Sequence, residues 1–311
     1  MTAGRALVAA AAWGGRDLRL LAQRENAVYA MQMADGTRAA LRLHREGYQT
    51  EQAIRSELWW CGALAAAGVA VPTPWPSLAG DVLAGFDSGC FASVIAWADG
   101  APMGAAGVPL AGSLPDRCAN HRALGRLLAQ MHSATDALTL PPGFQRHRWD
   151  QDGLLGDAPF WGRFWKHHAL AADEAATLLR ARDALRERLQ SHLDAGGDFG
   201  LIHADVLREN VLVNDGSLTL IDFDDCGFGF RHYDLGTVMS QNLYEPQRDA
   251  LCDALLDGYA SLRPVDANMV AMFTLLRTLA SVGWAEPRLA KGDPVHRSHI
   301  NRALMYAAEV I

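Results

Sequence analysis

The chain has 311 residues, of which 50% are apolar and 20% charged. This is the composition of a globular protein large enough for one large domain or two ordinary ones. The formal net charge of −7 argues against a nucleic-acid partner, because binding to phosphates requires a basic surface. Only Lys166 and Lys291 among the 28 basic residues are lysines. Any cation needed in the first half of the chain must therefore be arginine or histidine.

The cysteines and the apolar segments indicate where such a protein would reside. The five cysteines are scattered without a C-x-x-C pair, which is typical of reduced thiols in a cytosolic protein and does not match a zinc site. No apolar run reaches the length of a membrane span. We therefore expect a cytoplasmic protein with no membrane partner.

The first hundred residues predict a small sheet with helices. An amphipathic helix is expected directly after Arg5, and three strands near 18–23, 27–33 and 38–43. Asp35-Gly36, between the last two, is a hairpin signal. The apolar pattern then predicts a helix from about Glu51 to Ala67, ending at Gly68, and strand-like sequence resumes as far as Trp97.

The remainder of the chain is mostly helical in pattern. A segment rich in glycine, alanine and proline, 99–112, separates it from the sheet region. Strand and turn signals return only in 199–226. The predicted helices cover about 117–134, 173–193, 231–243, 247–261 and 267–284. We therefore predict an α+β fold with two lobes, a β-rich lobe at 1–98 and a larger helical lobe at 99–311.

The strongest functional signal is a polar motif followed by a hairpin. An apolar entry leads to His203-x-Asp205, and Asn210 follows after four residues. Two short apolar strands then flank Asp215-Gly216, which predicts a hairpin that Asn210 opens and Asp222 closes. Antiparallel pairing places these two residues opposite each other or one residue offset. Three oxygen-bearing side chains should therefore gather at one end of the hairpin.

This set suits the transfer of a phosphoryl group. Magnesium prefers hard oxygen ligands, so Asn210 and Asp222 could hold it against a nucleotide. A separate carboxylate, Asp205, could orient an acceptor hydroxyl and take its proton. We expect His203 to support the loop rather than react. The structural alternative is that these residues are turn formers and that Asp222 caps a strand end.

The same residues resemble a known family. His203-x-Asp205-x4-Asn210 followed by Ile221-Asp222-Phe223 is similar to the Brenner-type motif of the aminoglycoside phosphotransferase and choline kinase superfamily, which includes homoserine kinases and has a protein-kinase-like fold. Ala204 stands where protein kinases have arginine. The small-lobe pattern is followed in order by Glu25-Asn26-x-Val-Tyr29, Leu41-Arg42-Leu43, Ile54-x-x-Glu57-Leu58 and Val71-Pro72-x-Pro74.

The resemblance implies an ATP site between the lobes. A strand cation, usually lysine, would pair with a helix glutamate and grip the phosphates; here Arg42 and Glu57 occupy these positions. The turn that contains Asn26 would cover the phosphates. Ile95 to Trp97 would form the hinge that offers backbone hydrogen bonds to adenine. No G-x4-G-K-[ST] phosphate loop occurs in the sequence.

Three further polar residues lie outside the core motif. Asp224 would point the same way as Asp222 if the strand continued, as a further carboxylate of the metal site or as a solvated loop acid. Asp234 is expected to be a helix N-terminal acid that steadies the catalytic loop. His132 is expected to be a histidine at a helix end whose ring nitrogens have hydrogen-bond partners, rather than a ligand.

We therefore expect a phosphotransferase that uses ATP and Mg²⁺, with Asp205 as base. Its partners would be ATP and a small hydroxyl compound: an amino alcohol, an amino acid such as homoserine, a sugar or an aminoglycoside. A stress-response-type Ser/Thr protein kinase is the first alternative. A nucleotide-binding module that has lost transfer is the second, supported only by arginine in place of lysine. A metallohydrolase is remote, because such sites recruit more histidines and carboxylates.

Overall fold

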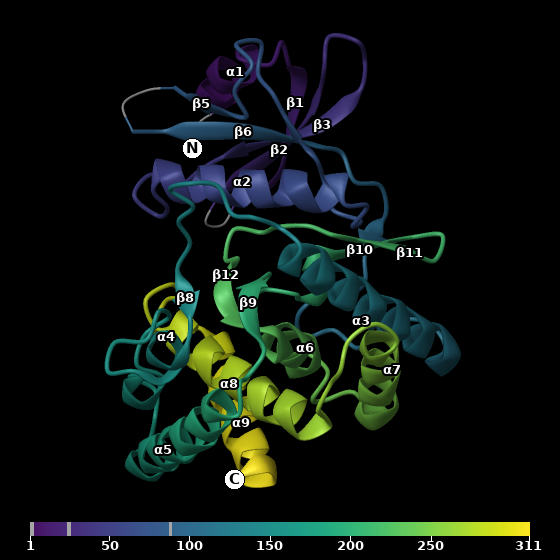
Figure 1. Cartoon of the computed structure of the whole chain (residues 1–311). Helices are drawn as coiled ribbons and strands as arrows, with labels where there is room; N and C mark the ends of the chain where they lie inside the picture. Colours follow the sequence, from purple (N-terminus) through teal and green to yellow (C-terminus); the bar gives the residue numbers. More distant parts are fainter. Residues whose placement is uncertain (1–2, 24–25, 87–88) are drawn as a thin grey trace.

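The computed structural model describes residues 3–23, 26–86 and 89–311. The chain forms two lobes, a sheet-based one above and a mostly helical one below (Figure 1). This is the α+β architecture expected from the sequence.

The small lobe is built on an antiparallel sheet in the order β1-β2-β3-β6-β4, with β5 paired to β6. Helix α1 (Ala3–Ala11) packs on this sheet through Ala6 and Ala9, and α2 (Glu51–Ala66) lies between the sheet and the helical lobe (Figure 1). The predicted first helix, first three strands and second helix are confirmed. The strands are β1 (Arg16–Gln23), β2 (Ala27–Gln32), β3 (Arg38–Leu43), β4 (Pro74–Trp75), β5 (Leu83–Gly85) and β6 (Phe91–Ala96).

Helix α2 positions one of the predicted site residues. The Thr50 side chain caps it by accepting a hydrogen bond from the Ala53 amide at 3.1 Å. Gly68, with φ +81°, follows its end, a conformation that glycine adopts without steric cost. Ile54, Glu57 and Leu58 are spaced at i, i+3 and i+4 and share the buried face. The fold therefore directs the carboxylate of Glu57 into the protein.

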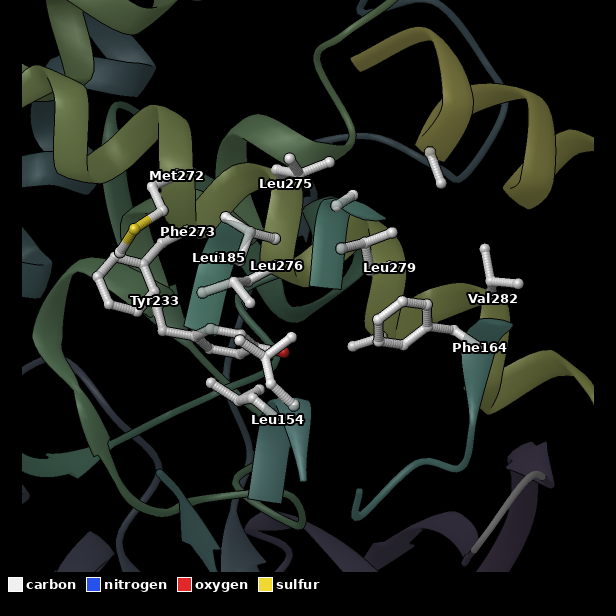
Figure 2. Close-up of a cluster of buried hydrophobic side chains, with 14 of the residues drawn as sticks. Leu154, Phe164, Leu185, Tyr233, Met272, Phe273, Leu275, Leu276, Leu279 and Val282 are labelled. Atoms are coloured by element: carbon white, nitrogen blue, oxygen red, sulfur yellow. The ribbon is translucent and has the colours of Figure 1, made fainter. Parts of the chain in front are cut away.

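The large lobe surrounds a core centred on α8, which packs against α6 and α9. Figure 2 shows this cluster, in which Tyr233 of α6 and Leu185 of α5 lie against Phe273 and Leu276 of α8. Helix α9 was not among the predicted helices. The helices are α3 (Leu114–Asp136), α4 (Gln151–Leu155), α5 (Ala172–Asp194), α6 (Arg231–Ser240), α7 (Arg248–Ala260), α8 (Ala267–Ala285) and α9 (Pro294–Val310), with 3₁₀ turns η1 (Phe164–Lys166) and η2 (Arg208–Asn210).

Two three-stranded sheets carry the catalytic segment. One has the order β11-β10-β7 and the other β8-β12-β9. They consist of β7 (Ala101–Pro102), β8 (Arg148–Trp149), β9 (Phe199–Ile202), β10 (Val211–Asn214), β11 (Ser217–Leu220) and β12 (Gly227–Phe230).

The predicted hairpin is β10–β11. Its turn residues Asp215 and Gly216 have φ values of 47° and 79°, the backbone of a type I′ turn. Val211 pairs with Leu220, and the Ile221 amide donates to the Asn210 carbonyl at 2.9 Å. Asn210 is therefore offset by one residue from Asp222, within the predicted range.

Buried polar contacts join the two lobes. Arg146 donates to the carbonyl oxygens of Ala53 in α2, at 3.1 Å, and of Cys226, at 2.6 Å. The Trp60 indole of α2 donates to the Thr135 hydroxyl of α3 at 3.1 Å. Because these contacts link α2 to the large lobe, they fix the small lobe over the catalytic hairpin. Within the described part of the chain, no helix is long and apolar enough to cross a membrane.

Candidate active site

The loop before the β10–β11 hairpin, which contains His203 to Asp205, is held by Asp234 in the first turn of α6. Its two carboxylate oxygens accept hydrogen bonds from the amides of His203, at 2.9 Å, and Ala204, at 2.7 Å. Ala204 has φ +66°, a conformation that is costly for a residue with a Cβ. His132 contacts Asp234 at 3.0 Å and the Tyr259 hydroxyl at 2.9 Å. Asp234 and His132 thus have the structural roles expected from the sequence.

His203 is a buried support of the same loop. Its Nε2 lies 3.0 Å from the Ile221 carbonyl and its Nδ1 lies 3.3 Å from the Asp205 amide. A carbonyl can only accept and an amide can only donate, so the ring carries its proton on Nε2. Both nitrogens are therefore used to join the loop to the end of the hairpin, which leaves neither for reaction.

Asp205 presents a carboxylate with a fixed orientation. Arg277 donates to its Oδ1 at 2.8 Å, and the Asn210 side chain donates to its Oδ2 at 3.0 Å. The Asp205 side chain keeps 18% of its surface exposed. Each carboxylate oxygen has a second lone pair. The group can therefore accept a further hydrogen bond from a substrate hydroxyl without releasing its two holders.

Asn210 and Asp222 form a donor set that suits magnesium. The Asn210 amide nitrogen donates to both the backbone carbonyl and the carboxylate of Asp205, which leaves its carbonyl oxygen for another ligand. Asp222 is exposed, although atoms of both lobes surround it. These atoms displace part of the water around the carboxyl group. This desolvation, together with repulsion from Asp205, raises the pKa of Asp222 despite attraction to Arg42. A bound cation would relieve this repulsion, so the residues fit the metal.

Two further carboxylates, Asp224 and Asp225, crowd the same region. Burial raises the pKa of Asp225 well above its ordinary value, and repulsion from Asp205 and Asp224 adds to the effect. Its carboxylate accepts a hydrogen bond from the Tyr48 hydroxyl at 3.1 Å. A cation bound beside these carboxyl groups would favour their charged forms, so the region is suited to cationic ligands.

Arg42 is buried between two acids. Its guanidinium lies 2.5 Å from Glu57 and 3.3 Å from Asp224. Burial disfavours the charge of Glu57, but attraction to Arg42 and Arg146, together with the hydrogen bond from Arg42, outweighs it and lowers the pKa of that carboxyl. The expected pairing of Arg42 with Glu57 is therefore present, while its role toward phosphates stays a prediction. Asp224 does not follow Asp222 along a strand, because β11 ends at Leu220; it is instead the second partner of Arg42.

Arg277 is a site residue that sequence reasoning missed. It lies in α8, contacts Asp205, donates to the Ser281 hydroxyl at 2.7 Å and stacks 4.5 Å from the centre of the Trp161 ring. It is the only charged residue of that helix. The signal that could have identified it is a single charge in an otherwise apolar helix, since a buried charge needs a partner.

The expected nucleotide contacts lie in the small lobe. Asn26 accepts a hydrogen bond from the Arg45 amide at 3.1 Å. Arg24 and Glu25, the other residues of the predicted turn, lie outside the described residues. Ile95 lies in β6, paired with β3 and β4 on its two sides. Trp97 follows that strand, and the Arg38 guanidinium stacks 3.8 Å from its ring centre. The roles of Asn26, Ile95 and Trp97 stay predictions.

A cavity of about 710 Å³ lies on the other side of Tyr48 from Asp225. One wall is the segment 45–48 between β3 and α2, and the other is formed by Trp284 and the residues after α8, 287–289. Tyr48 belongs to this wall and also contacts Asp225. The cavity is therefore a candidate pocket for a second substrate.

Known proteins are similar to this chain in sequence. The chain is 28% identical to amicoumacin kinase of Bacillus subtilis over 74% of this chain and 64% of that protein. It is 30% identical to homoserine kinase of Neisseria meningitidis over 48% of this chain and 46% of that protein. These matches span less than two thirds of the length of either relative.

A solved structure matches over almost the whole chain. The microcompartment-associated aminopropanol kinase has 31% sequence identity and a TM-score of 0.82, and the match covers 99% of this chain and 95% of that one. The family model described as "Phosphotransferase enzyme family" matches residues 17–268. By the motif, the two-lobed fold and these matches, the chain belongs to the phosphotransferase enzyme family.

Proposed function

We propose that this protein is a kinase that uses ATP and magnesium to phosphorylate a hydroxyl group of a small molecule. The observation that carries the proposal is the Asp205 carboxylate, which Arg277 and Asn210 hold at 2.8 and 3.0 Å. A carboxylate fixed in this way is suited to orient a nucleophile. Membership of a phosphotransferase family supports the same reaction.

Asp205 would act on the acceptor hydroxyl. Its carboxylate would accept a hydrogen bond from the hydroxyl and take the proton as the oxygen bonds to the γ-phosphorus. The Arg277 guanidinium would keep the carboxylate from turning away. The buried contacts of Asp234 and His203 would hold the loop, so that little reorganisation accompanies the reaction.

The remaining polar residues would hold the nucleotide. Asn210 and Asp222 would bind magnesium, which supplies positive charge to the transferring phosphates when bound. Arg42, oriented by Glu57, would grip the α- and β-phosphates. Asn26 would cover the phosphates, and Ile95 and Trp97 would adjoin the adenine.

The acceptor we favour is a small amino alcohol. The support is the 31% identity to an aminopropanol kinase over almost the whole chain. Asp225 accepts a hydrogen bond from Tyr48 of the cavity wall, and the ammonium group of such a compound, bound beside it, would favour its charged form and pair with it.

An amino acid acceptor is the second candidate, because one observation favours it. Arg277 places a guanidinium 2.8 Å from the proposed base, where it could also attract a substrate carboxylate. The 30% identity to a homoserine kinase is consistent with this choice.

Matched acceptor pairs provide the test. 1-Aminopropan-2-ol and threonine differ by one carboxylate, as do 3-aminopropan-1-ol and homoserine. We expect ATP-dependent phosphorylation of an amino alcohol with kcat/KM at least about tenfold above that of its amino acid partner, the discrimination available from one charged contact. ADP release and the mass of the product are measured, with Asp205→Asn protein as blank.

The outcomes separate the alternatives. A preference for threonine or homoserine would reverse the choice of acceptor. Phosphorylation of peptides alone would favour a protein kinase. Magnesium-dependent nucleotide binding with turnover no higher than the blank for every acceptor, sugars and aminoglycosides included, would favour a binding module.

A further inference from the structure

A second group of metal-ligating side chains lies away from the nucleotide site, at the junction of η1, α8 and α9. His167 and His168 follow η1, and Glu286 follows α8. The Glu286 carboxylate lies 2.8 Å from Nδ1 of His168 and 3.1 Å from Nε2 of His167. One ligand atom from each of the three residues lies within 4.8 Å of the others. Three donor atoms from separate segments therefore converge on one point.

Outer contacts orient the donor atoms. Nε2 of His168 donates to the Lys291 carbonyl at 3.2 Å, and Nδ1 donates to the Glu286 carboxylate at 2.8 Å in the absence of an ion. Coordination would release the Nδ1 proton and leave this nitrogen as a ligand, with Nε2 still held by the carbonyl. His296, in the first turn of α9, uses its Nε2 on the Ala290 carbonyl at 3.0 Å and directs Nδ1 to Nε2 of His167 at 2.9 Å. Metal-binding histidines in proteins commonly donate their second nitrogen to a carbonyl in this way.

The surroundings are suited to hold an ion and to admit one. The His167 side chain is fully buried, whereas the side chains of His168 and Glu286 keep 26% and 39% of their surface exposed. Glu286 is also the C-cap of α8, and the negative end of a helix dipole disfavours a carboxylate there. The backbone amide and the side chain of His168 donate to this carboxylate at 3.0 and 2.8 Å, and a cation would replace the side-chain contact while also offsetting the dipole of the helix.

We propose that His167, His168 and Glu286 form a zinc site. Two imidazole nitrogens and one carboxylate oxygen form a common ligand set for Zn²⁺, with a water or the neighbouring His296 as the fourth ligand. The Ala169 amide donates to Nδ1 of His167 at 3.1 Å, so without an ion the proton of this ring lies on Nε2. Coordination would move that proton to Nδ1 and break the Ala169 contact.

The site adjoins the wall of the candidate acceptor pocket. Glu286 lies between Trp284 and Pro287, and both of these residues line the 710 Å³ cavity. A zinc ion would tie that wall to the segment after η1. The proposal is independent of the kinase reaction, because it rests on contacts outside the nucleotide site.

Zinc binding to tag-free, EDTA-treated protein tests the proposal. We expect one tightly held Zn²⁺ per chain by titration calorimetry and by metal analysis after dialysis. Glu286→Gln and His168→Ala should each weaken zinc binding by roughly 10- to 100-fold. Two matched variants should bind as the parent does: Glu187→Gln, an exposed acid of α5, and Asp222→Asn, which removes the carboxylate of the proposed magnesium site.

Thermal unfolding gives a second readout that does not depend on activity. Zinc should raise the melting temperature of the parent protein and of both matched variants, and leave that of Glu286→Gln and His168→Ala unchanged. Melting of each variant without metal checks that it is folded. Zinc affinity in Glu286→Gln and His168→Ala equal to that of the parent, or loss of binding only in Asp222→Asn, would overturn the proposal.

Discussion

Replacing Asp205 by asparagine is expected to lower kcat by about 10²- to 10⁴-fold, the usual contribution of a positioned general base. The amide has no basic oxygen at neutral pH. It also offers one acceptor where the carboxylate offers two, so either Arg277 or Asn210 loses its hydrogen bond. Nucleotide affinity should stay close to that of the parent. Steady-state kinetics and calorimetric titration with a non-hydrolysable ATP analogue measure the two effects separately.

The matched control is Asp215→Asn. Asp215 is an exposed carboxylate in the β10–β11 turn, with φ 47°, and asparagine tolerates that conformation. Its kinetics should match those of the parent. If Asp205→Asn instead loses nucleotide affinity and keeps its kcat, Asp205 is a binding residue and another group is the base.

Replacing Arg42 by alanine is expected to damage both stability and nucleotide binding. The change leaves Glu57, which is 0% exposed, and the buried Asp224 without their shared cation. Removal of one partner of a buried ion pair costs about 3–5 kcal/mol of unfolding free energy. If Arg42 also grips the phosphates, KM for ATP should rise roughly ten- to a hundredfold, as expected for the loss of a charged hydrogen bond. Chemical denaturation and kinetics measure these effects.

Arg42→Lys separates the role of charge from that of geometry, and Arg19→Ala is the matched control. Arg42→Lys keeps the cation but not the planar fork that contacts two carboxylates, so it should recover part of the stability. Arg19→Ala removes an exposed arginine from β1 of the same sheet and should change the unfolding free energy by less than about 0.5 kcal/mol. An unchanged KM for ATP in folded Arg42→Ala protein would reduce Arg42 to a structural residue.

The catalytic hairpin could be predicted because its signals are local. Asp215-Gly216 specifies the turn, the turn fixes the register, and the register places Asn210 beside Asp222. The α2 boundaries were also readable, since Thr50 and Gly68 mark the two ends. These features depend on neighbouring residues alone.

Other features depend on tertiary contacts. Helix α9 was missed because its buried face consists of His296, Ile300, Ala303 and Ala307, which gives a weak apolar pattern. The orientation of Asp224 was not predictable, because Asp222 adopts φ +64° and turns the chain away from a strand path. The strands β7 and β8 have two residues each, so pairing with distant strands defines them rather than their own sequence.

Magnesium-dependent binding of a non-hydrolysable ATP analogue tests the central claim most directly. Calorimetric titration is carried out on the parent, Asn210→Ala and Asp222→Ala, each with and without Mg²⁺. We predict that magnesium strengthens binding to the parent and that this gain is greatly reduced in both variants, while binding without metal changes little. An equal gain from magnesium in all three proteins would place the metal elsewhere and contradict the proposed site.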